Sequence, residues 1–553
     1  MAARIAWIAA ALFLFAVGYG SYRFHHVPMC PDEVDLAKYP VECAEGDKIL
    51  DGIDRHTRAV YGLMRTFNSP RGKVADNITV PTEWYGDREM LKLPFPQEVM
   101  AWDEDRPAES LMGKVVGAVF DYLNMKTFHP LVDDSTDFAS VEEGGDVMGA
   151  VANESLKPLE LTPWSELGSD EAISQFAFAG LAAHRLEKIG NDNDGAVYKS
   201  DWTWLHGPEL RPGYEAYGAA AYFDANATLR KIYWSHGGEI VRPGDPDWNH
   251  AKWAYKASVM VGATLRDHLV GVHFTSSANL AHSAVRYLNP GHPLRRLLKP
   301  HTYGTASINK VAIATLATEF SFFHRASAFT WKGMLDGFEL AHSTWEFEPM
   351  KEHLAEIGMD AAPADIYSWG DDGVGFFDIV HRYVSRYVHL YYEDDASVHA
   401  DAEAQAFWQG LFRTGGKNDV AAVSSRQRLS YVVAHQIFLV TGLHNHVGNV
   451  ADYFRCPTFL SAKLRAGTEV SDRQSSFQEL NIALATAMPA PRLIADYTHL
   501  LLPDKYLPQT TAAFRDFQAD LTAYAEVIQE RNKHRRFPCS SFDPKKMISS
   551  VSI

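Results

Sequence analysis

The segment "LRDHLVGVHFTSS" (265–277) places two histidines, His268 and His273, five residues apart in an otherwise apolar stretch. A five-residue step advances an α-helix by well over one turn, so the two rings diverge on a regular helix. A π-type turn would align them, and such turns cluster at functional sites. Two interpretations stay open on this segment alone: hydrogen-bonded core histidines, or ligands of one metal ion.

A second apolar stretch, "AHQIFLVTGLHNHVGNVADYF" (434–454), carries His435, His444, His446 and Asn449. The step from His444 to Asn449 repeats the five-residue spacing of the first pair. Buried imidazoles cost free energy unless their ring nitrogens find partners. This helix therefore requires either a polar network or a metal ion.

The sequence ends on "KKMISSVSI" (545–553), in which an apolar Ile553 carries the α-carboxylate. A carboxylate is a hard oxygen ligand, and three imidazoles with one carboxylate suit iron, manganese or zinc. An apolar last side chain would anchor this carboxylate in a buried pocket. The three stretches together predict a single metal site.

Composition and pattern favour a mainly α-helical fold. The chain has 553 residues, 46% of them hydrophobic, and its net charge of -17 argues against nucleic acid as a partner. Helical patterns at 253–288, 306–324, 374–392 and 427–454 are apolar on more than one face, which is typical of helices inside a large bundle. A small β-hairpin is expected at 219–235, where Asp224-Ala225-Asn226 supplies a turn.

The first 25 residues read as a targeting segment. Arg4 precedes an apolar run (5–18) and a small-x-small triplet, Gly18-Tyr19-Gly20, as in a secretory signal peptide. We expect a secreted, periplasmic or lumenal protein; the alternative is an uncleaved anchor that attaches the chain to a membrane. Residues 26–160 are expected to form an N-terminal extension that packs on a catalytic domain at 161–553.

The four cysteines, Cys30, Cys43, Cys456 and Cys539, form no C-x-x-C pair, which argues against a thiolate zinc site. Cys30 and Cys43 would close a small loop in an oxidising compartment, or remain two separate thiols. The sequence leaves both alternatives open.

Four motifs in order make the chain resemble a lipoxygenase over about 160–553. The family carries H-x4-H, then H-P-[LI]-x-x-L-L-x-P-H with I-N-x-[LV]-A, then Y-x-x-R-D-D-G before Y-Y, and an R-N-x4-P ending that terminates on isoleucine. The counterparts here are "HLVGVH" (268–273), "HPLRRLLKPHTYGTASINKVA" (292–312), "YSWGDDGVGFFDIVHRYVSRYVHLYYEDDASV" (367–398) and "ERNKHRRFPCSSFDPKKMISSVSI" (530–553).

The resemblance implies one non-haem iron per chain, with manganese as the alternative metal. His268 and His273 match the first two ligands, and Ile553 supplies its main-chain carboxylate. The usual H-x3-N-x3-Y pattern is altered: the approach to the ligand selects His444, with His446 in reserve, and implies one inserted residue before Asn449. Asn449 is expected as a weaker ligand or as a group just outside the metal shell.

The resemblance also implies the reaction. A polyunsaturated fatty acid and O2 are the expected partners, a fatty-acid hydroperoxide is the product, and the hydroxide on the metal is the only catalytic group. The family's N-terminal β-barrel is expected to be missing, and Asp452 stands where relatives often carry glutamine.

Further positions take their meaning from the resemblance. Ala312 and Leu316 match channel positions, where plain core packing is the alternative; Ala at the first tends to accompany S-hydroperoxides. His292 and His301 are expected to be structural, and His282 a core or surface residue. Other functions kept open are a hydroperoxide isomerase, a non-catalytic lipid-binding relative, and a hydrolytic zinc enzyme, against which the absence of H-E-x-x-H counts.

Overall fold

The computed structural model describes residues 168–235, 237–305, 322–412, 421–448, 462–464 and 491–552, together with positions 308, 309, 312, 316, 317 and 466. Two predicted regions, the targeting segment (1–25) and the N-terminal extension (26–160), lie outside the described residues, as do Cys30, Cys43 and Cys456. Cys539 is described and is a buried free thiol. Among the described residues, none of the helices is both long enough and apolar enough to cross a bilayer.

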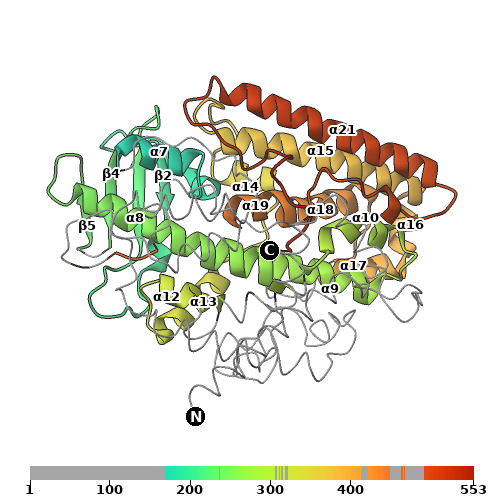
Figure 1. Ribbon diagram of the computed structural model, residues 1–553, viewed down its shortest axis with the longest axis horizontal. Coiled ribbons are helices and arrows are strands. Elements are labelled where there is room, and N and C mark those ends of the chain that lie inside the picture. The colour runs from blue at the N-terminus through green and yellow to red at the C-terminus, as the bar shows by residue number, and fades with distance from the viewer. Residues whose placement is uncertain are drawn as a thin grey trace, which may run out of the picture.

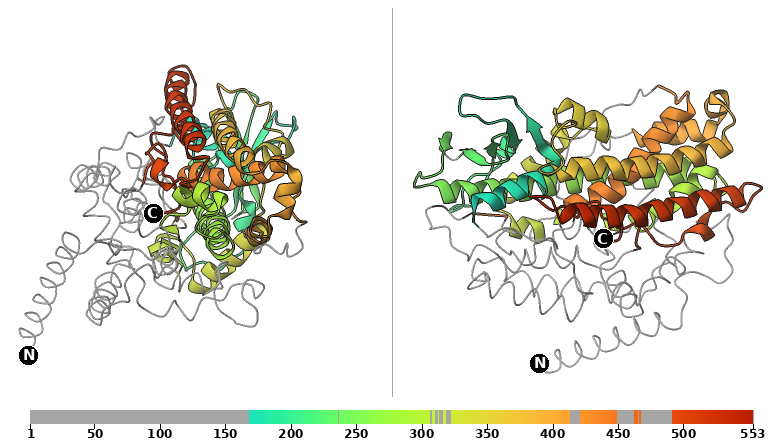
Figure 2. Two further views of the ribbon diagram at one scale, coloured as in Figure 1. Left: turned by 90° about the vertical axis from the view of Figure 1, so that its right-hand side faces the viewer. Right: turned by 90° about the horizontal axis from the view of Figure 1, so that it is seen from above.

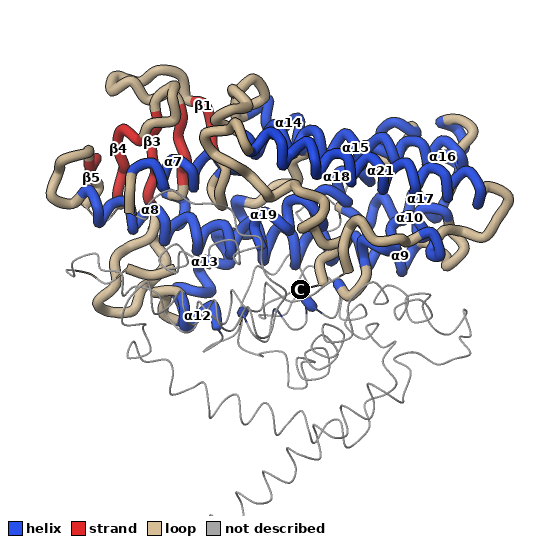
Figure 3. Tube along the Cα trace, turned by 45° about the horizontal axis from the view of Figure 1, so that its top comes forward, coloured by secondary structure: helices blue, strands red, loops and turns tan. Residues whose placement is uncertain are grey.

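A small sheet lies at one end of a body of helices (Figures 1 and 3). The predicted hairpin is present as β3 (Ala219–Phe223) and β4 (Leu229–Trp234), joined at a turn where Asp224 accepts hydrogen bonds from the backbone N–H groups of Asn226 and Thr228. It forms the centre of a sheet larger than predicted, with five antiparallel strands in sequence order. The outer strands are β1 (Leu186–Lys188), β2 (Tyr198–Asp201) and β5 (Glu239–Val241). These strands are short and partly exposed, which leaves little hydrophobic signal to predict them from.

One continuous helix runs along the length of the molecule and carries the first histidine pair. It consists of α8 (Trp248–Gly262), a π-helical segment η6 (Ala263–Ser277) and α9 (Ala278–Tyr287). Nearly every residue of η6 is buried, as predicted for a helix enclosed by others. Figure 2 shows this helix, in green, surrounded by the other layers.

A second interrupted helix, with α18 (Arg426–Phe438), a π-helical turn η7 (Leu439–Leu443) and α19 (His444–Gly448), packs against η6. On its other side lies α15 (Ser368–Tyr391), which runs beside α21 (Leu507–Asn532) along the surface (Figure 2). The remaining elements are α7 (Asp170–Phe178), η4 (Ala183–Arg185), η5 (Thr203–Leu205), α10 (Pro293–Thr302), α12 (Phe322–Ala326), α13 (Trp331–Thr344), α14 (Met350–Glu356), α16 (Asp395–Ala400), α17 (Ala402–Leu411) and η11 (Thr498–Leu500).

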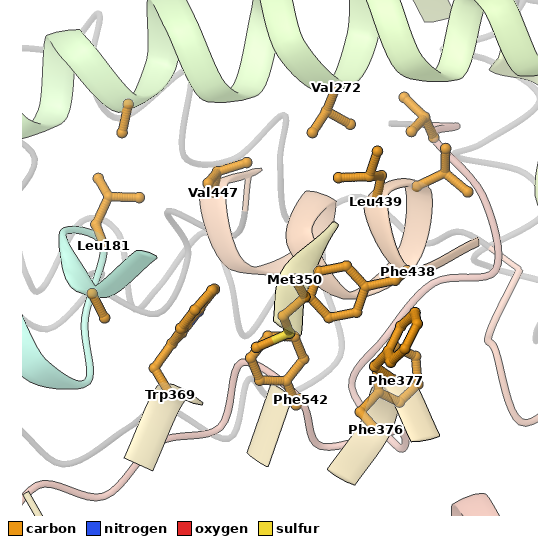
Figure 4. Packing of buried hydrophobic residues seen from close by; sticks show 14 of the residues in the cluster. Leu181, Val272, Met350, Trp369, Phe376, Phe377, Phe438, Leu439, Val447 and Phe542 are labelled. Carbon is orange, nitrogen blue, oxygen red and sulfur yellow. The ribbon is translucent and has the colours of Figure 1, made fainter. Parts of the chain in front are cut away.

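The core between these helices is aromatic. Phe438 of α18 lies among Phe376 and Phe377 of α15 and Phe542 of the C-terminal segment. On the opposite side of the same helix, Val272 projects from η6 toward Leu439 and Val447 (Figure 4). Phe438 and Phe542 stack with ring centroids 5.6 Å apart. Burial of such rings contributes about 2 kcal/mol or more each, so this layer holds the helix that leads to His444 against α15 and the C-terminal segment.

Candidate metal centre

The π-helical geometry of η6 brings the first two histidines together. The Nε2 atoms of His268 and His273 lie 3.1 Å apart, and both rings are buried. A π-helix closes its hydrogen bonds between residues five apart, so the five-residue step returns the side chain to the same face. The predicted widened turn is therefore present, and it extends over the whole of η6 rather than one turn.

His444 completes a cluster of three imidazoles. Its Nε2 lies 3.2 Å from that of His273, and all three donor atoms lie within 4.8 Å of one another. The π-helical turn η7 ends immediately before His444 and rotates it toward η6. Within the described part of the chain, this is the one cluster of three or more His, Cys, Asp or Glu side chains with the spacing of a metal site.

Burial keeps the three imidazoles neutral. It lowers the pKa of His273 to about 4 and the pKa values of His268 and His444 well below their usual range. Repulsion between the neighbouring rings lowers the last two further. A metal ion binds the neutral form of imidazole, so the cluster offers its donor lone pairs at physiological pH without having to lose a proton.

Asn309 orients His273 toward the centre of the cluster. Its Nδ2 donates to the backbone oxygen of His273 (2.8 Å), which leaves its Oδ1 to accept from Nδ1 of the His273 ring (2.8 Å). The proton thus sits on Nδ1, and the Nε2 lone pair points at the other two rings. Asn309 was not predicted as a site residue, although it belongs to the motif "INKVA" (308–312). The signal that could have identified it was a polar side chain within a predicted apolar helix.

The spacing of the donors fits a metal ion. An ion with bonds of about 2.1 Å to two ligands at right angles holds their donor atoms about 3 Å apart. The two measured Nε2 separations, 3.1 and 3.2 Å, agree with this value. Three converging, neutral, buried imidazoles therefore suit a divalent or trivalent transition metal.

His446, the reserve ligand, points away from the cluster. Its Nε2 lies 3.1 Å from Nδ1 of His184, and Nε2 of His184 lies 2.8 Å from a carboxylate oxygen of Asp267. Arg185 also pairs with Asp267. Burial by itself would raise the pKa of Asp267, but Arg185, Arg266 and His184 hold it well below its usual range.

Ser541, His446, His184 and Asp267 form a row of hydrogen bonds, and the ionised Asp267 determines which atom carries each proton in it. His184 donates from Nε2 to the carboxylate, so its Nδ1 must accept from Nε2 of His446. The Nδ1 of His446 in turn accepts from the hydroxyl of Ser541, 2.9 Å away. This row of hydrogen bonds joins Asp267, the residue before His268, to the helix that carries His444. No local sequence pattern indicates the row, because its members come from four distant segments.

Four further histidines lie away from the cluster, and His292 and His301 have the structural positions predicted for them. His292 caps α10, where its Nδ1 accepts from the N–H of Leu294, and His301 donates from Nδ1 to the backbone oxygen of Ser549 (2.8 Å). His282 is buried in α9, and His435 lies buried among aromatic rings.

The C-terminal segment is buried from Met547 to Ser552 and is hydrogen-bonded at Ser549 and Ser550. The hydroxyl of Ser550 donates to the backbone oxygen of Tyr303, and the N–H of Ser549 donates to that of Pro491. Val551 is fully buried. The segment that holds this tail, 301–303, is followed at 309 by the asparagine that orients His273. Ile553, Asn449 and Asp452 lie outside the described residues, so their roles stay predictions.

The two predicted channel residues lie in the segment after Asn309. Ala312 is buried, and Leu316 is partly buried against the same hydrophobic core. Both positions agree with core packing as well as with a channel wall, and their role in a channel stays a prediction.

Known proteins resemble this chain in family pattern, in sequence and in fold. The family model for lipoxygenases matches residues 245–457, which include all three clustered histidines. The mouse epidermal-type polyunsaturated fatty acid (12S)/(13S)-lipoxygenase is 25% identical over 336 residues, 56% of this chain and 50% of that protein. Human hydroperoxide isomerase ALOXE3 is 26% identical, over 57% of this chain and 47% of that protein. The chain thus spans about half the length of the curated relatives it matches.

The fold is also similar to that of solved lipoxygenase structures. The structure of a calcium-dependent 11R-lipoxygenase superposes with a TM-score of 0.64 and 18% identity, covering 78% of this chain and 72% of that one. The predicted mainly helical, lipoxygenase-type fold is confirmed. The family model and the sequence relatives make the chain similar to lipoxygenases, and the fold that it shares with a solved lipoxygenase agrees with this.

Proposed function

We propose that the protein is a non-haem iron dioxygenase that converts a polyunsaturated fatty acid and O2 into a fatty-acid hydroperoxide. A hydrogen atom leaves the methylene between two cis double bonds, O2 adds to the resulting pentadienyl radical, and the hydrogen atom is returned to give the hydroperoxide. The observation that carries the proposal is the convergence of the His268, His273 and His444 donor atoms in a buried site. Relatives named as polyunsaturated fatty acid lipoxygenases support the substrate class.

Iron bound at this site would supply the one-electron chemistry that removes the hydrogen atom. His268, His273 and His444 would hold it, with the carboxylate of Ile553 as the predicted fourth ligand. The protein's own contribution is to present neutral donors, to fix the His273 ring through Asn309, and to enclose the site in apolar side chains. Enclosure keeps bulk water away from a radical that would otherwise react unselectively.

The direct test is to load the purified protein with ferrous iron, determine bound metal, and incubate it with linoleate or arachidonate while following conjugated-diene absorbance. We expect about one iron per chain and oxygen uptake equal to diene formed. Loading with manganese in parallel tests the alternative metal. An iron-loaded protein that forms no diene with any polyunsaturated acid would contradict the proposed reaction, and a chain that retains no metal would favour the non-catalytic alternative.

A second reaction is favoured by one of the relatives. Human hydroperoxide isomerase ALOXE3 matches the chain about as well as the lipoxygenases do. Incubation with a fatty-acid hydroperoxide in the absence of O2 separates the two reactions, because an isomerase forms a product of unchanged mass. We expect dioxygenation to be the faster of the two.

We also propose that residues 1–25 direct the chain to an exported or lumenal location, with membrane attachment if they are retained. The support is the order of a basic residue, an apolar run and a small-residue site in the sequence. Fractionation of cells that express the chain with and without these residues tests the proposal. Equal distribution of the two forms in the cytosol would contradict it.

A further inference from the structure

A cavity of about 50 Å³ lies beside the two helices that carry the clustered histidines, with walls from η4, η6, α14, α15, α18 and η7. Four of its wall residues are labelled in Figure 4: Met350, Trp369, Phe438 and Leu439. A single water needs about 10–15 Å³ of such space, so a molecule of a few heavy atoms fits. Asp267 and Leu443, which directly precede His268 and His444, also line the cavity. A molecule bound there would therefore contact both ligand-bearing helices.

Two deeply buried polar side chains on the cavity wall are left without partners. The part of the chain that the structure describes offers no hydrogen-bond partner to Nε1 of Trp369, which is 2% exposed, or to either ring nitrogen of His435, which is 1% exposed. Burial lowers the pKa of His435 to about 3; the backbone oxygen of Glu348 opposes this shift, but it lacks the geometry of a hydrogen bond. Buried polar groups are normally satisfied, and such groups at a cavity indicate a bound polar molecule.

Charged groups on the cavity wall are already paired with one another. Arg185 donates from Nε and Nη2 to Asp267 and from Nη1 to Glu348. Burial by itself would raise the pKa of Glu348, but His353 and Arg185 lower it to about 2, so this carboxylate is ionised. An anion would therefore lie beside the carboxylates of Asp267 and Glu348, and a cation beside the guanidinium of Arg185. Burying a further charge there costs free energy, so an uncharged molecule is the better match.

We propose that this cavity is a binding site for a small uncharged alcohol. Its carbon chain would pack against the apolar part of the wall, which includes Phe438 and Leu439. Its hydroxyl would pair with Nε1 of Trp369 or with a ring nitrogen of His435. A hydroxyl both donates and accepts hydrogen bonds, so it can satisfy either group. The inference goes beyond the proposed reaction, because binding of the alcohol requires neither the metal nor the fatty acid.

Saturation-transfer difference NMR on the full chain, with n-propanol as the probe, measures the binding directly. We expect saturable binding with a dissociation constant in the millimolar range, since so small a molecule makes few contacts. Propionate and propylammonium have nearly the same size and shape as n-propanol but carry a charge. Each should bind at least about tenfold more weakly than n-propanol, because its charge would have to be desolvated.

Two variants test the polar groups of the site. His435→Phe keeps an aromatic ring of similar size and removes both ring nitrogens, and Trp369→Phe removes the indole N–H. We expect the affinity for n-propanol to fall about fivefold in the variant that removes the partner of the hydroxyl. His381→Phe is the matched control, because His381 contacts Phe377 as His435 does but lies outside the cavity wall. Its affinity should stay within about twofold of wild type.

Several results would overturn the inference. The absence of saturable n-propanol binding would do so, as would binding of propionate or propylammonium with equal affinity. Unchanged affinity in both His435→Phe and Trp369→Phe would exclude these groups as partners of the hydroxyl. An equal loss in His381→Phe would show a general effect of the exchange instead of a local one. Failure of the proposed oxygenase reaction would leave all of these measurements unaffected.

Discussion

Asn309 holds His273 at two points, accepting a hydrogen bond from the ring at Nδ1 and donating one to the backbone oxygen of the same residue, each 2.8 Å long. The pair fixes both the tautomer and the rotation of one imidazole. Groups that orient a metal ligand in this way affect metal binding although they do not touch the ion.

Replacing Asn309 by alanine should weaken iron binding by about tenfold to a hundredfold. The His273 ring would lose its fixed orientation, while the helix and the other two histidines would remain. Competition against a chelator measures the affinity, and circular dichroism checks the fold. Asn309→Asp should also weaken binding: its carboxylate still accepts from Nδ1, but it cannot donate to the backbone oxygen of His273. Equal affinities in all three proteins would show that the ring is held by packing alone.

His444→Ala and His446→Ala should behave differently, although the two residues are two apart in sequence. The first removes a clustered donor and should abolish bound iron. The second cuts the hydrogen-bond row to His184 and should leave near-stoichiometric metal while lowering the melting temperature. Metal content of the purified variants gives the answer. Loss of metal from His446→Ala alone would reverse the ligand assignment.

Asp267→Asn should destabilise the protein by about 3 kcal/mol, because it leaves the buried Arg266 and His184 and the partly buried Arg185 around a neutral group. Asp267 is 1% exposed, and Arg266 is 8% exposed. Urea unfolding at neutral pH measures the free energy of unfolding. Arg386→Ala, which removes a surface pair with Asp516, is the control and should cost about 0.5 kcal/mol or less. Equal losses would mean that the buried cluster is not specially stabilising.

His435, which lies buried among aromatic rings, should make the free energy of unfolding depend on pH. Burial lowers the pKa of His435 to about 3 in the folded protein. Below about pH 6.5 the unfolded chain binds a proton there that the folded chain does not, so the free energy of unfolding falls as the pH falls. At pH 5 this one residue costs about 2 kcal/mol relative to pH 7.

His435→Phe should remove this contribution, so the fall in stability between pH 7 and 5 should be smaller than in wild type by about 2 kcal/mol, as measured by urea unfolding at several pH values. Phe438→Leu is the control in the same cluster: it should lower stability equally at all of these pH values. A His435→Phe profile parallel to that of wild type would show that His435 titrates alike in both states.

Deletion of Ile553 tests the predicted carboxylate ligand. We expect loss of metal and of turnover with the fold retained, since the described tail is held through Ser549 and Ser550, before the deleted residue. An added C-terminal tag should have the same effect, because it converts the carboxylate into an amide. Full metal content in both forms would exclude the carboxylate as a ligand.

Much of the site could be predicted because its chemistry is local. The five-residue step in 268–273 required a widened helix, and the structure contains one. The pairing of His444 with the first two histidines followed from motif order. The Asp267, His184, His446 and Ser541 row could not be predicted, since no local pattern shows which distant residues meet. The outer strands were missed because three or four half-exposed residues have no clear periodicity.

The row from Ser541 to Asp267 has one further consequence. Because the ionised Asp267 can only accept, the direction of the row cannot be reversed without protonating Asp267, which would leave Arg185 and Arg266 beside a neutral group. The row therefore allows a single registry between η6 and α19, and this registry sets the position of the peptide that precedes His268. Geometry at a reactive centre is usually attributed to the atoms that surround it; in this protein it is also set by the positions of three hydrogens, one layer further out.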